Sequence, residues 1–410
     1  MNSPINKTKE RLWIITELYY PELTSTGYYM TEIAEGLAEQ RPVSVICGQP
    51  NYSARGVTAP PKEFRNGVEI FRLPFARLNK NVFLFRVINM VTLAVAVLFS
   101  GLKNLNKGER VLVVTTPPLL PFVAAFASLA RGCPYTLLIH DVYPDLAAAV
   151  GKTRPGSIIF RFSDFANRCL YKHASKIIVV GRDMADKIKE KSAGLDPCIE
   201  YIPNWAELET VEPRPRDGNE LLAALGIEAD LVLLYAGNLG YPNDIESILK
   251  AAEILAKSKA AVHFLFVGDG VKRRLVEAAV SGKNNGNITY IGPKPRSEQS
   301  IFLNACDAGL VALVRGMLGV SMPSRTYNLL AAGRPILAIT EPGSEIERTV
   351  TEASAGWCVE PGNPQALANK ILEILSEREK LPEMGRRARE AAVGRFGLTM
   401  AIVRYMEVLD

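Results

Sequence analysis

The stretch that most constrains this chain runs from Ala308 to Ile339. Two apolar runs of strand length, residues 309–314 and 335–339, enclose a glycine-bearing loop and an apolar helix pattern over residues 324–332. The helix pattern stops at Gly333, as a helix with a glycine C-cap should. The pattern therefore predicts a strand, a loop, a helix and a second strand, the repeating unit of a parallel sheet.

The end of this loop bears candidate anion-binding groups. A helix N-terminus at the carboxyl edge of a parallel sheet offers free backbone N–H groups to an anion. Ser324 adds a hydroxyl, and Arg325 adds a guanidinium that can hold phosphate oxygens with two hydrogen bonds at once. We expect a phosphate or diphosphate site here. The alternative is an ordinary capped helix whose Arg325 faces water.

Length and composition indicate a folded protein of two domains. A chain of 410 residues is too long for one core, and 48% of its residues are hydrophobic. The formal net charge of +5 is small, and no basic stripe with interleaved aromatics appears, so nucleic-acid binding is not expected. The six cysteines form no CxxC pair, which is typical of a reducing cytoplasm and argues against structural zinc. No signal-peptide pattern opens the sequence, so we expect a cytoplasmic protein.

The first half of the chain alternates strand and helix patterns, which predicts an α/β fold. We expect residues 1–205 to form one Rossmann-like domain. Gly27 follows the first strand pattern, where a glycine lets backbone approach a ligand closely; alternatively, it only starts the next helix. His140 and Asp141 follow the strand pattern at residues 135–139, and open α/β sheets bind ligands at such strand ends. The alternative is that both side chains only satisfy loop backbone.

The most apolar segment of this half runs from Val82 to Leu102, interrupted by Arg86 and Asn89. Three interpretations are open: a membrane span, an interfacial helix, and a buried core helix. The interruptions disfavour a span, which needs about 20 consecutive apolar residues. The neighbouring aromatic and basic residues suit an interfacial helix. A buried core helix is the leading interpretation.

The composition changes after residue 205. Residues 206–220 are acidic and proline-rich, which predicts a linker. Residues 221–392 repeat the strand and helix alternation and predict a second Rossmann-like domain, with a C-terminal helix at residues 393–410 that packs back on the first domain. Glycine loops follow the first two strand patterns of the second domain. Two such domains predict ligand binding in a cleft between their sheets.

Short motifs along nearly the whole chain give it a family resemblance. In order they are ITELYYPELTSTGYYMTEIAEGLAE, IHDVYPD, IPNW, YAGNLG, FVGDG, ITYIG, MPSRTYNLLAAGRPILA and GSEIE. The chain resembles a GT-B glycosyltransferase of family GT4, particularly the bacterial capsule, O-antigen and exopolysaccharide branch that includes fucosamine-type transferases. No single motif is decisive, but their order and spacing are specific together.

The resemblance implies a reaction and its partners. The donor would be a nucleotide diphosphate-sugar, with UDP the commonest base in this branch, and transfer would retain the anomeric configuration without a metal or other cofactor. The acceptor would be a glycan or a polyprenyl-diphosphate-linked sugar in cell-surface polysaccharide biosynthesis. The protein would then be cytoplasmic or peripheral on the inner face of the membrane, with the segment from Val82 to Leu102 as the candidate contact.

The resemblance also assigns site residues in both domains. The expected catalytic residues are Asp141, His140 and Arg325. The expected donor-binding residues are Gly27, Gly237, Asn238, Gly268, Lys294, Ser324, Arg325, Asn328 and Glu345. The expected acceptor-side residues are Tyr20 and Asp145. No metal ligands are expected, since no DxD motif occurs.

The glutamate pair usual in the family is absent. Its positions fall at Val320 and Asn328, neither of which is acidic. Asn328 could still bond ribose hydroxyls as an amide. This departure favours one alternative, a non-catalytic nucleotide-sugar-binding protein. A nucleotide-sugar 2-epimerase of the same fold is the other alternative, whereas a nicotinamide-dependent dehydrogenase would need a GxGxxG motif that the first unit lacks.

The first donor loop departs from the family as well. It has Asn238 and Asn243 where many relatives have arginine and lysine. Positive charge for a diphosphate must then come mainly from Arg325, with Lys294 or Arg296 as helpers.

Overall fold

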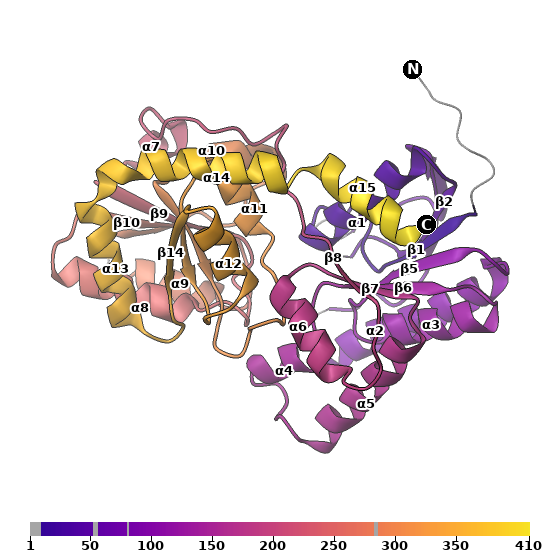
Figure 1. Cartoon of the computed structure of the whole chain (residues 1–410). Helices are drawn as coiled ribbons and strands as arrows, with labels where there is room; N and C mark the ends of the chain where they lie inside the picture. The colour runs from indigo at the N-terminus through magenta and orange to yellow at the C-terminus, as the bar shows by residue number, and fades with distance from the viewer. Residues whose placement is uncertain (1–9, 52–55, 80–81, 283–285) are drawn as a thin grey trace. The chain divides into compact units, whose positions relative to one another are not determined.

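The computed structural model describes residues 10–51, 56–79, 82–282 and 286–410. The chain divides into two compact units. Residues 1–143, 156–203 and 401–410 form unit 1, and residues 144–155 and 204–400 form unit 2. Each unit is built on one sheet of mostly parallel strands with helices packed on it (Figure 1). The predicted α/β fold class is confirmed.

Unit 1 contains an eight-stranded sheet in the order β3-β4-β2-β1-β5-β6-β7-β8. Its strands are β1 (Leu12–Ile15), β2 (Val43–Gly48), β3 (Lys62–Arg65), β4 (Val68–Leu73), β5 (Arg110–Val114), β6 (Tyr135–Ile139), β7 (Lys176–Val179) and β8 (Ile199–Tyr201). Every residue of β1, β2 and β6 is buried, as expected of central parallel strands covered on both faces. The edge strand β3, which the sequence pattern did not predict, pairs antiparallel with β4.

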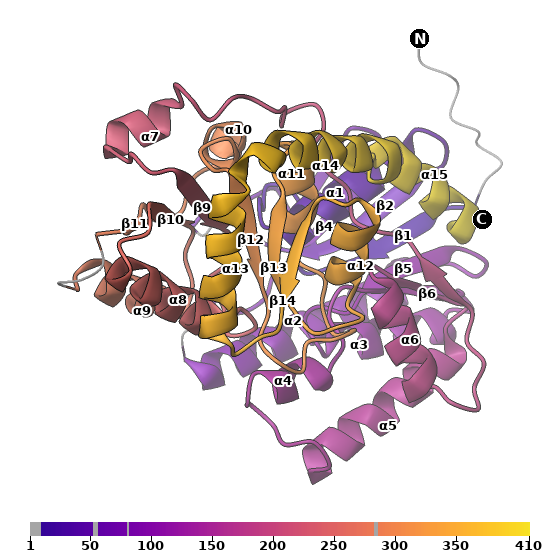
Figure 2. The same ribbon diagram turned by 60° about the vertical axis from the view of Figure 1, so that its left-hand side comes forward.

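The helices of unit 1 lie on both sides of this sheet. They are α1 (Ser25–Ala38), α2 (Phe83–Asn104), α3 (Leu120–Ala130), α5 (Ile158–His173), α6 (Arg182–Lys191) and most of α15 (Leu398–Leu409). In both views α2, α3 and α5 lie together, on the side of the sheet away from α1 and α15 (Figures 1 and 2).

Helix α2 is not the buried core helix that we expected. Its inward face is buried at Asn89, Leu93, Ala94, Val97 and Gly101, but only 22% of its most apolar window is buried. By length and composition alone it is the one helix of the described residues that could cross a membrane, which is weak support for a span. One face of α2 therefore packs in the unit, while the other face is exposed although most of its side chains are apolar.

Unit 2 contains a six-stranded, all-parallel sheet in the order β11-β10-β9-β12-β13-β14. Its strands are β9 (Leu231–Ala236), β10 (Val262–Val267), β11 (Ile288–Tyr290), β12 (Ala308–Ala312), β13 (Ile336–Ile339) and β14 (Gly356–Val359). Its helices are α4 (Asp145–Ala149), α7 (Glu220–Leu225), α8 (Ile245–Lys257), α9 (Arg273–Val280), α10 (Gln299–Leu303), α11 (Arg325–Ala331), α12 (Glu345–Glu352), α13 (Pro364–Ser376) and α14 (Leu381–Arg395). Inward side chains of β9, β10 and β12 form its buried core with α8 and α13.

The strand, loop, helix and strand predicted for residues 308–339 are confirmed as β12, α11 and β13. Gly333 has a positive φ of 63° and follows Ala332, the C-cap residue of α11, as expected of a glycine that ends a helix. A Cβ atom on Gly309 of β12 would lie 2.3 Å from Leu329 Cδ2, so α11 lies directly on the strand. The unit therefore places the start of α11 at the carboxyl edge of the sheet.

Two helices end the chain. The C-terminal helix predicted at residues 393–410 corresponds to α15, which begins later than predicted, at Leu398, after α14 has ended at Arg395. Phe396 lies between the two helices, where its ring is buried against Tyr327, with centroids 4.9 Å apart, and its carbonyl accepts a hydrogen bond from Ala206 N.

Candidate functional site

Two glycine loops meet at the carboxyl edge of the unit 2 sheet. Gly237 follows β9 with φ 136°, and Gly268 follows β10 with φ 141°. A Cβ atom on Gly268 would lie 1.9 Å from Gly237 O, so the two loops touch backbone to backbone. Any side chain at Gly268 would both clash and strain the backbone. Tyr290 of β11 donates from its hydroxyl to Gly268 O at 2.9 Å, which fixes this turn from the other side.

Arg325, the first residue of α11, lies against the first of these loops. Its Cζ atom would be 3.2 Å from a Cβ on Gly237, so the absence of a side chain there makes room for the guanidinium. Its Cζ is 4.4 Å from the ring centroid of Tyr235, a cation–π contact. Burial raises the pKa of the Tyr235 hydroxyl, and the positive charge of Arg325 opposes that shift. Arg325 Nη2 also donates to Asn243 Oδ1 at 3.2 Å.

The other terminal nitrogen of Arg325 has no protein partner. Nη1 is buried and makes no hydrogen bond, and no carboxylate of the described residues lies within ion-pair distance of the guanidinium. Arg325 is half-buried, and a cation partly removed from water without a counter-charge is costly, a cost that a bound anion would remove. The arrangement is therefore an anion site whose negative charge the protein does not supply.

Hydrogen bonds hold the loop around Arg325 in place. The Asn238 carbonyl accepts from Tyr235 Oη at 2.7 Å and from Asn243 Nδ2 at 3.0 Å. Lys272 Nζ donates to the Asn243 carbonyl at 2.7 Å. With its carbonyl satisfied from inside, Asn238 leaves its side chain and the Gly237 backbone exposed at the surface of the site.

Glu207, in the predicted linker, binds groups that we had assigned to a ligand. Its carboxylate accepts two hydrogen bonds from Arg296, at 2.6 and 2.7 Å, and one from Asn328 Nδ2 at 2.6 Å. Asn328 Oδ1 accepts from Glu207 N at 2.9 Å, so both ends of that amide are occupied. Gln299 donates a further bond at 2.8 Å. Sequence reasoning missed Glu207 because no local pattern links a residue to a partner 121 positions away.

The two helper cations expected near the diphosphate are both paired with carboxylates. Arg296 is neutralised by Glu207, and Lys294 Nζ lies 2.9 Å from Glu298 Oε2. The positive charge of the site therefore rests on Arg325.

The remaining residues predicted for unit 2 lie at helix starts. Ser324 precedes α11 in a helical conformation, and its side chain makes no capping hydrogen bond. Helix α11 thus begins one residue later than predicted. Glu345 lies buried in the first turn of α12, where the Thr349 hydroxyl is 3.5 Å from its Oε1. Asp145, which was predicted for the acceptor side in the first domain, belongs to unit 2 and begins the short helix α4.

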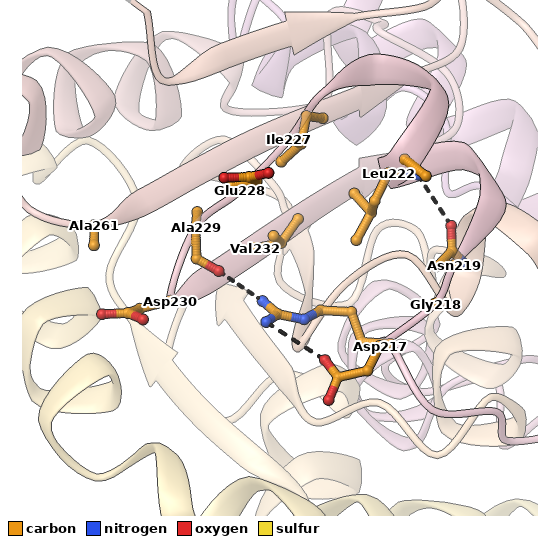
Figure 3. A pocket seen from close by; sticks show the side chains of 12 residues that line it. Asp217, Gly218, Asn219, Leu222, Ile227, Glu228, Ala229, Asp230, Val232 and Ala261 are labelled. Atoms are coloured by element: carbon orange, nitrogen blue, oxygen red, sulfur yellow. Dashed lines mark hydrogen bonds and ion pairs between the residues drawn. The ribbon is translucent and has the colours of Figure 1, made fainter.

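A hollow of about 550 Å³ lies at the opposite, amino-terminal edge of the same sheet (Figure 3). Asp217, Glu228 and Asp230 line it. Arg216, which also lines it, is satisfied by Asp307 Oδ2 and Ala229 O at 2.7 and 3.0 Å. Its acidic lining disfavours an anion, so this hollow is not a second diphosphate site.

In unit 1, polar side chains follow β5 and β6. His140 is half-buried, and burial lowers its pKa to about 4, so the imidazole is neutral at pH 7. Its Nε2 is buried and has no hydrogen-bond partner, as is Thr116 Oγ1 after the neighbouring strand β5. The Asp141 carbonyl accepts from Thr115 Oγ1 at 3.3 Å. The predicted cluster at this sheet edge therefore includes two buried polar atoms that the protein leaves unsatisfied.

Gly27 and Tyr20 lie in or beside α1. Gly27 is inside the first turn of the helix, not in the loop before it, and its N–H donates to the capping Thr24 Oγ1 at 3.3 Å. A Cβ on Gly27 would lie 2.5 Å from Glu22 O, so packing of the preceding loop already requires glycine. Tyr20 is partly exposed, with the Arg65 guanidinium 3.9 Å from its ring centroid.

Two family models match the chain, one after the other. The one described as glycosyl transferase 4-like domain matches residues 25–205, and the one described as glycosyl transferases group 1 matches residues 219–391. A Pseudomonas aeruginosa protein named "Probable glycosyltransferase WbjE" is 32% identical over 366 residues, which cover 89% of each chain. The chain belongs to the GT4 family of GT-B glycosyltransferases.

Other comparisons agree with this family. An Escherichia coli K12 protein named "Putative colanic acid biosynthesis glycosyl transferase WcaI" is 26% identical to this glycosyltransferase over 391 residues, which cover 91% of this chain and 93% of WcaI. Sucrose-phosphate synthase from Thermosynechococcus elongatus superposes with a TM-score of 0.78 at 17% identity, covering 98% of both chains. Anabaena HepE, solved with UDP and glucose, gives 0.72 at 15% identity, covering 98% of this chain and 99% of HepE. At these identities the two structures show the shared fold alone.

Within the glycosyltransferase, the structure brings together four of the residues predicted for the donor: Gly237, Asn238, Gly268 and Arg325. Asn328 and Lys294 do not join them as free ligands, because Asn328 is bonded to Glu207 and Lys294 is paired with Glu298. Tyr235 and Asn243, which orient Arg325, were not among the predicted site residues. The sequence signal that could have identified them was their position. Tyr235 lies at the end of a strand, and Asn243 lies in the first loop. In the described part of the chain, no group of three or more His, Cys, Asp or Glu side chains is placed to hold a metal ion.

Proposed function

We propose that this glycosyltransferase takes its sugar from a nucleotide diphosphate-sugar, with a UDP-sugar as the first candidate, and retains the anomeric configuration. The observation that carries this proposal is the buried, unpartnered Nη1 of Arg325 beside the exposed Gly237 backbone. A guanidinium beside an exposed glycine backbone matches the charge and size of a diphosphate. The occurrence of UDP with a protein of the same fold, HepE, supports the choice of base.

Arg325 would act on the departing diphosphate. As the bond to the sugar breaks, negative charge accumulates on the leaving group, and a fixed guanidinium stabilises that charge more than it stabilises the intact donor. The Tyr235 ring and Asn243 hold the guanidinium before the donor binds, so little reorganisation is needed. The proposal needs no metal because Arg325 supplies the positive charge.

His140 or Asp141 would orient the attacking hydroxyl of the acceptor. The neutral imidazole of His140 has an unsatisfied Nε2, which can bond a sugar hydroxyl. A pKa of about 4 makes it a weak base at pH 7, so positioning is its main role and proton removal is secondary.

The acceptor would be a glycan or a polyprenyl-diphosphate-linked sugar in cell-surface polysaccharide biosynthesis. The description of the Escherichia coli relative, colanic acid biosynthesis, supports this assignment. A lipid-linked acceptor would require a cytoplasmic enzyme that contacts the membrane, and the exposed apolar face of α2, within the segment from Val82 to Leu102, is the contact that we propose.

The test is turnover by Arg325→Met. We expect kcat with a UDP-sugar to fall by about 10²- to 10³-fold, as for other losses of a charge-stabilising group, with the melting temperature unchanged or raised. Arg274→Met, at an exposed arginine of α9, is the matched control and should keep full activity. Undiminished turnover by Arg325→Met would remove the basis of the proposal, and an inverted anomer in the product would refute retention.

A further inference from the structure

Large apolar side chains gather on one side of unit 1. They belong to α2, α3 and α5, and the most exposed are Phe83 (75%), Phe99 (68%), Phe126 (62%), Ile158 (86%), Ile159 (73%), Phe162 (71%) and Phe165 (65%). Single exposed apolar residues are normal on soluble proteins, but contiguous groups mark interaction surfaces. These three helices therefore form a candidate docking surface.

Helix α5 carries the most exposed part of this surface. Ile158, Phe162 and Phe165 recur at spacings of four and three residues, which places them on one face of the helix. The opposite face packs into the unit through Asn167, Leu170 and Tyr171. One side of α5 thus packs against the core of unit 1, whereas the side that bears Ile158, Phe162 and Phe165 is exposed.

The surface is continuous across the three helices. Helix α3 contacts both α2 and α5, and all three lie together in both views (Figure 2). Phe126 and Leu129 of α3 are both exposed, so the apolar character does not stop between the outer helices.

Positive charges accompany the apolar residues. Arg86 and Lys103 on α2 and Arg161 and Lys172 on α5 are exposed, and none lies within ion-pair distance of a carboxylate in the described ranges. Helices α2 and α3 contain no acidic residue. The one acidic residue of α5, Asp164, forms an ion pair with Lys191. An apolar surface with unpaired cations is complementary to a bilayer with anionic headgroups.

A second copy of the chain fits this surface less well. In a two-fold dimer the same patch meets itself, so the unpaired cations of one copy would face those of the other. Like charges brought together at an interface are unfavourable, and the one carboxylate of these three helices, Asp164, is already paired with Lys191.

We propose that α2, α3 and α5 dock the protein on an anionic lipid bilayer, with Ile158, Phe162 and Phe165 in the acyl layer and Arg161 at the headgroups. This proposal extends the membrane contact from α2 to α3 and α5, for which the sequence predicted no membrane contact. The docking proposal depends on lipid chemistry alone and needs no sugar donor. The docking proposal can therefore be wrong while the proposed reaction is right, and the proposed reaction can be wrong while the docking proposal is right.

The first test is flotation of the purified protein with vesicles of phosphatidylcholine mixed with phosphatidylglycerol. We expect the double variant Ile158→Ser/Phe162→Ser to lose at least about tenfold of its vesicle partition, since two buried apolar side chains are removed. The matched control is Phe64→Ser on β3, where the ring is 73% exposed but lies outside the three helices. Circular dichroism and turnover with a soluble acceptor would confirm that both variants are folded. Equal partition of the double variant and the wild type would overturn the proposal, as would a wild type that does not float.

The second test distinguishes the contribution of the positive charges to vesicle binding from the contribution of the apolar side chains. Arg161→Glu/Lys172→Glu should weaken binding to anionic vesicles several-fold, and added salt should weaken wild-type binding in the same direction. Arg274→Glu in unit 2 is the control. Equal wild-type binding to pure phosphatidylcholine would refute the anionic assignment. A wild-type dimer that Ile158→Ser/Phe162→Ser dissociates would assign the surface to self-association instead.

Discussion

Arg325 differs from other arginines of low exposure in what balances its charge. Arg72 pairs with Glu63, Arg216 with Asp307, and Arg296 with Glu207. Arg325 has an aromatic ring and an amide oxygen as neighbours and a terminal nitrogen with no partner. The paired arginines have their charge balanced within the fold, whereas the half-buried Arg325 has its charge available for a ligand.

His140 should make stability depend on pH. The folded-state pKa is about 4 because of burial, whereas an unfolded histidine has a pKa of about 6.5. Between these values the unfolded chain binds more protons than the folded chain, so the free energy of unfolding falls as pH is lowered from 7 towards 4. Urea unfolding of His140→Gln should show a smaller loss over this range than the wild type. His173→Gln, at the exposed end of α5, is the control. An unchanged pH dependence in His140→Gln would contradict the assigned burial.

Glu207 should stabilise unit 2. Glu207→Ala leaves the Arg296 guanidinium and the Asn328 amide without their acceptor, and we expect the free energy of unfolding to fall by about 2–3 kcal/mol. The exposed Glu209→Ala is the matched control and should change it by no more than about 0.5 kcal/mol. Equal urea midpoints for the two variants would show that the network contributes little.

At the scale of elements, the loops after β9 and β10 should tolerate no side chain at Gly268. Gly268→Ala adds a Cβ within 1.9 Å of Gly237 O at a φ of 141°. Backbone strain alone should cost about 1–3 kcal/mol, and the shifted loop should weaken nucleotide binding. In Gly394→Ala the added Cβ meets open space within a helix, so stability should be equal or slightly higher. A Gly268→Ala protein as stable as Gly394→Ala would disprove the contact between the loops.

The elements also show what the sequence can and cannot predict. The β12, α11 and β13 unit was predictable because apolar runs, a helix period and a glycine cap all fall within 32 residues. Glu207 was not, because its partners lie on elements far along the chain. The exposure of α2 was not predictable either. When both faces of a helix are apolar, the sequence pattern does not show whether the second face contacts solvent or a core. The stripe at Ile158, Phe162 and Phe165 was visible in the sequence, but its exposure depends on how α5 packs.

At the scale of the whole molecule, the two units share a parallel α/β design, but each has its own polar edge. In unit 2 that edge holds Arg325 and the glycine loops. In unit 1 it holds the unsatisfied His140 Nε2 and Thr116 Oγ1. The family and the fold followed from motif order along the chain. The lost glutamates at Val320 and Asn328 do not remove the anion site, because its charge comes from Arg325.

The most direct measurement is the thermal shift of the purified protein with UDP, with and without EDTA, compared between wild type, Arg325→Met and Arg274→Met. UDP at about 100 times its Kd should stabilise wild type by about 2.7 kcal/mol. We predict that this shift survives EDTA, is kept in Arg274→Met and is lost in Arg325→Met. A UDP shift of equal size in Arg325→Met, or one that EDTA abolishes, would contradict an arginine-based, metal-free diphosphate site.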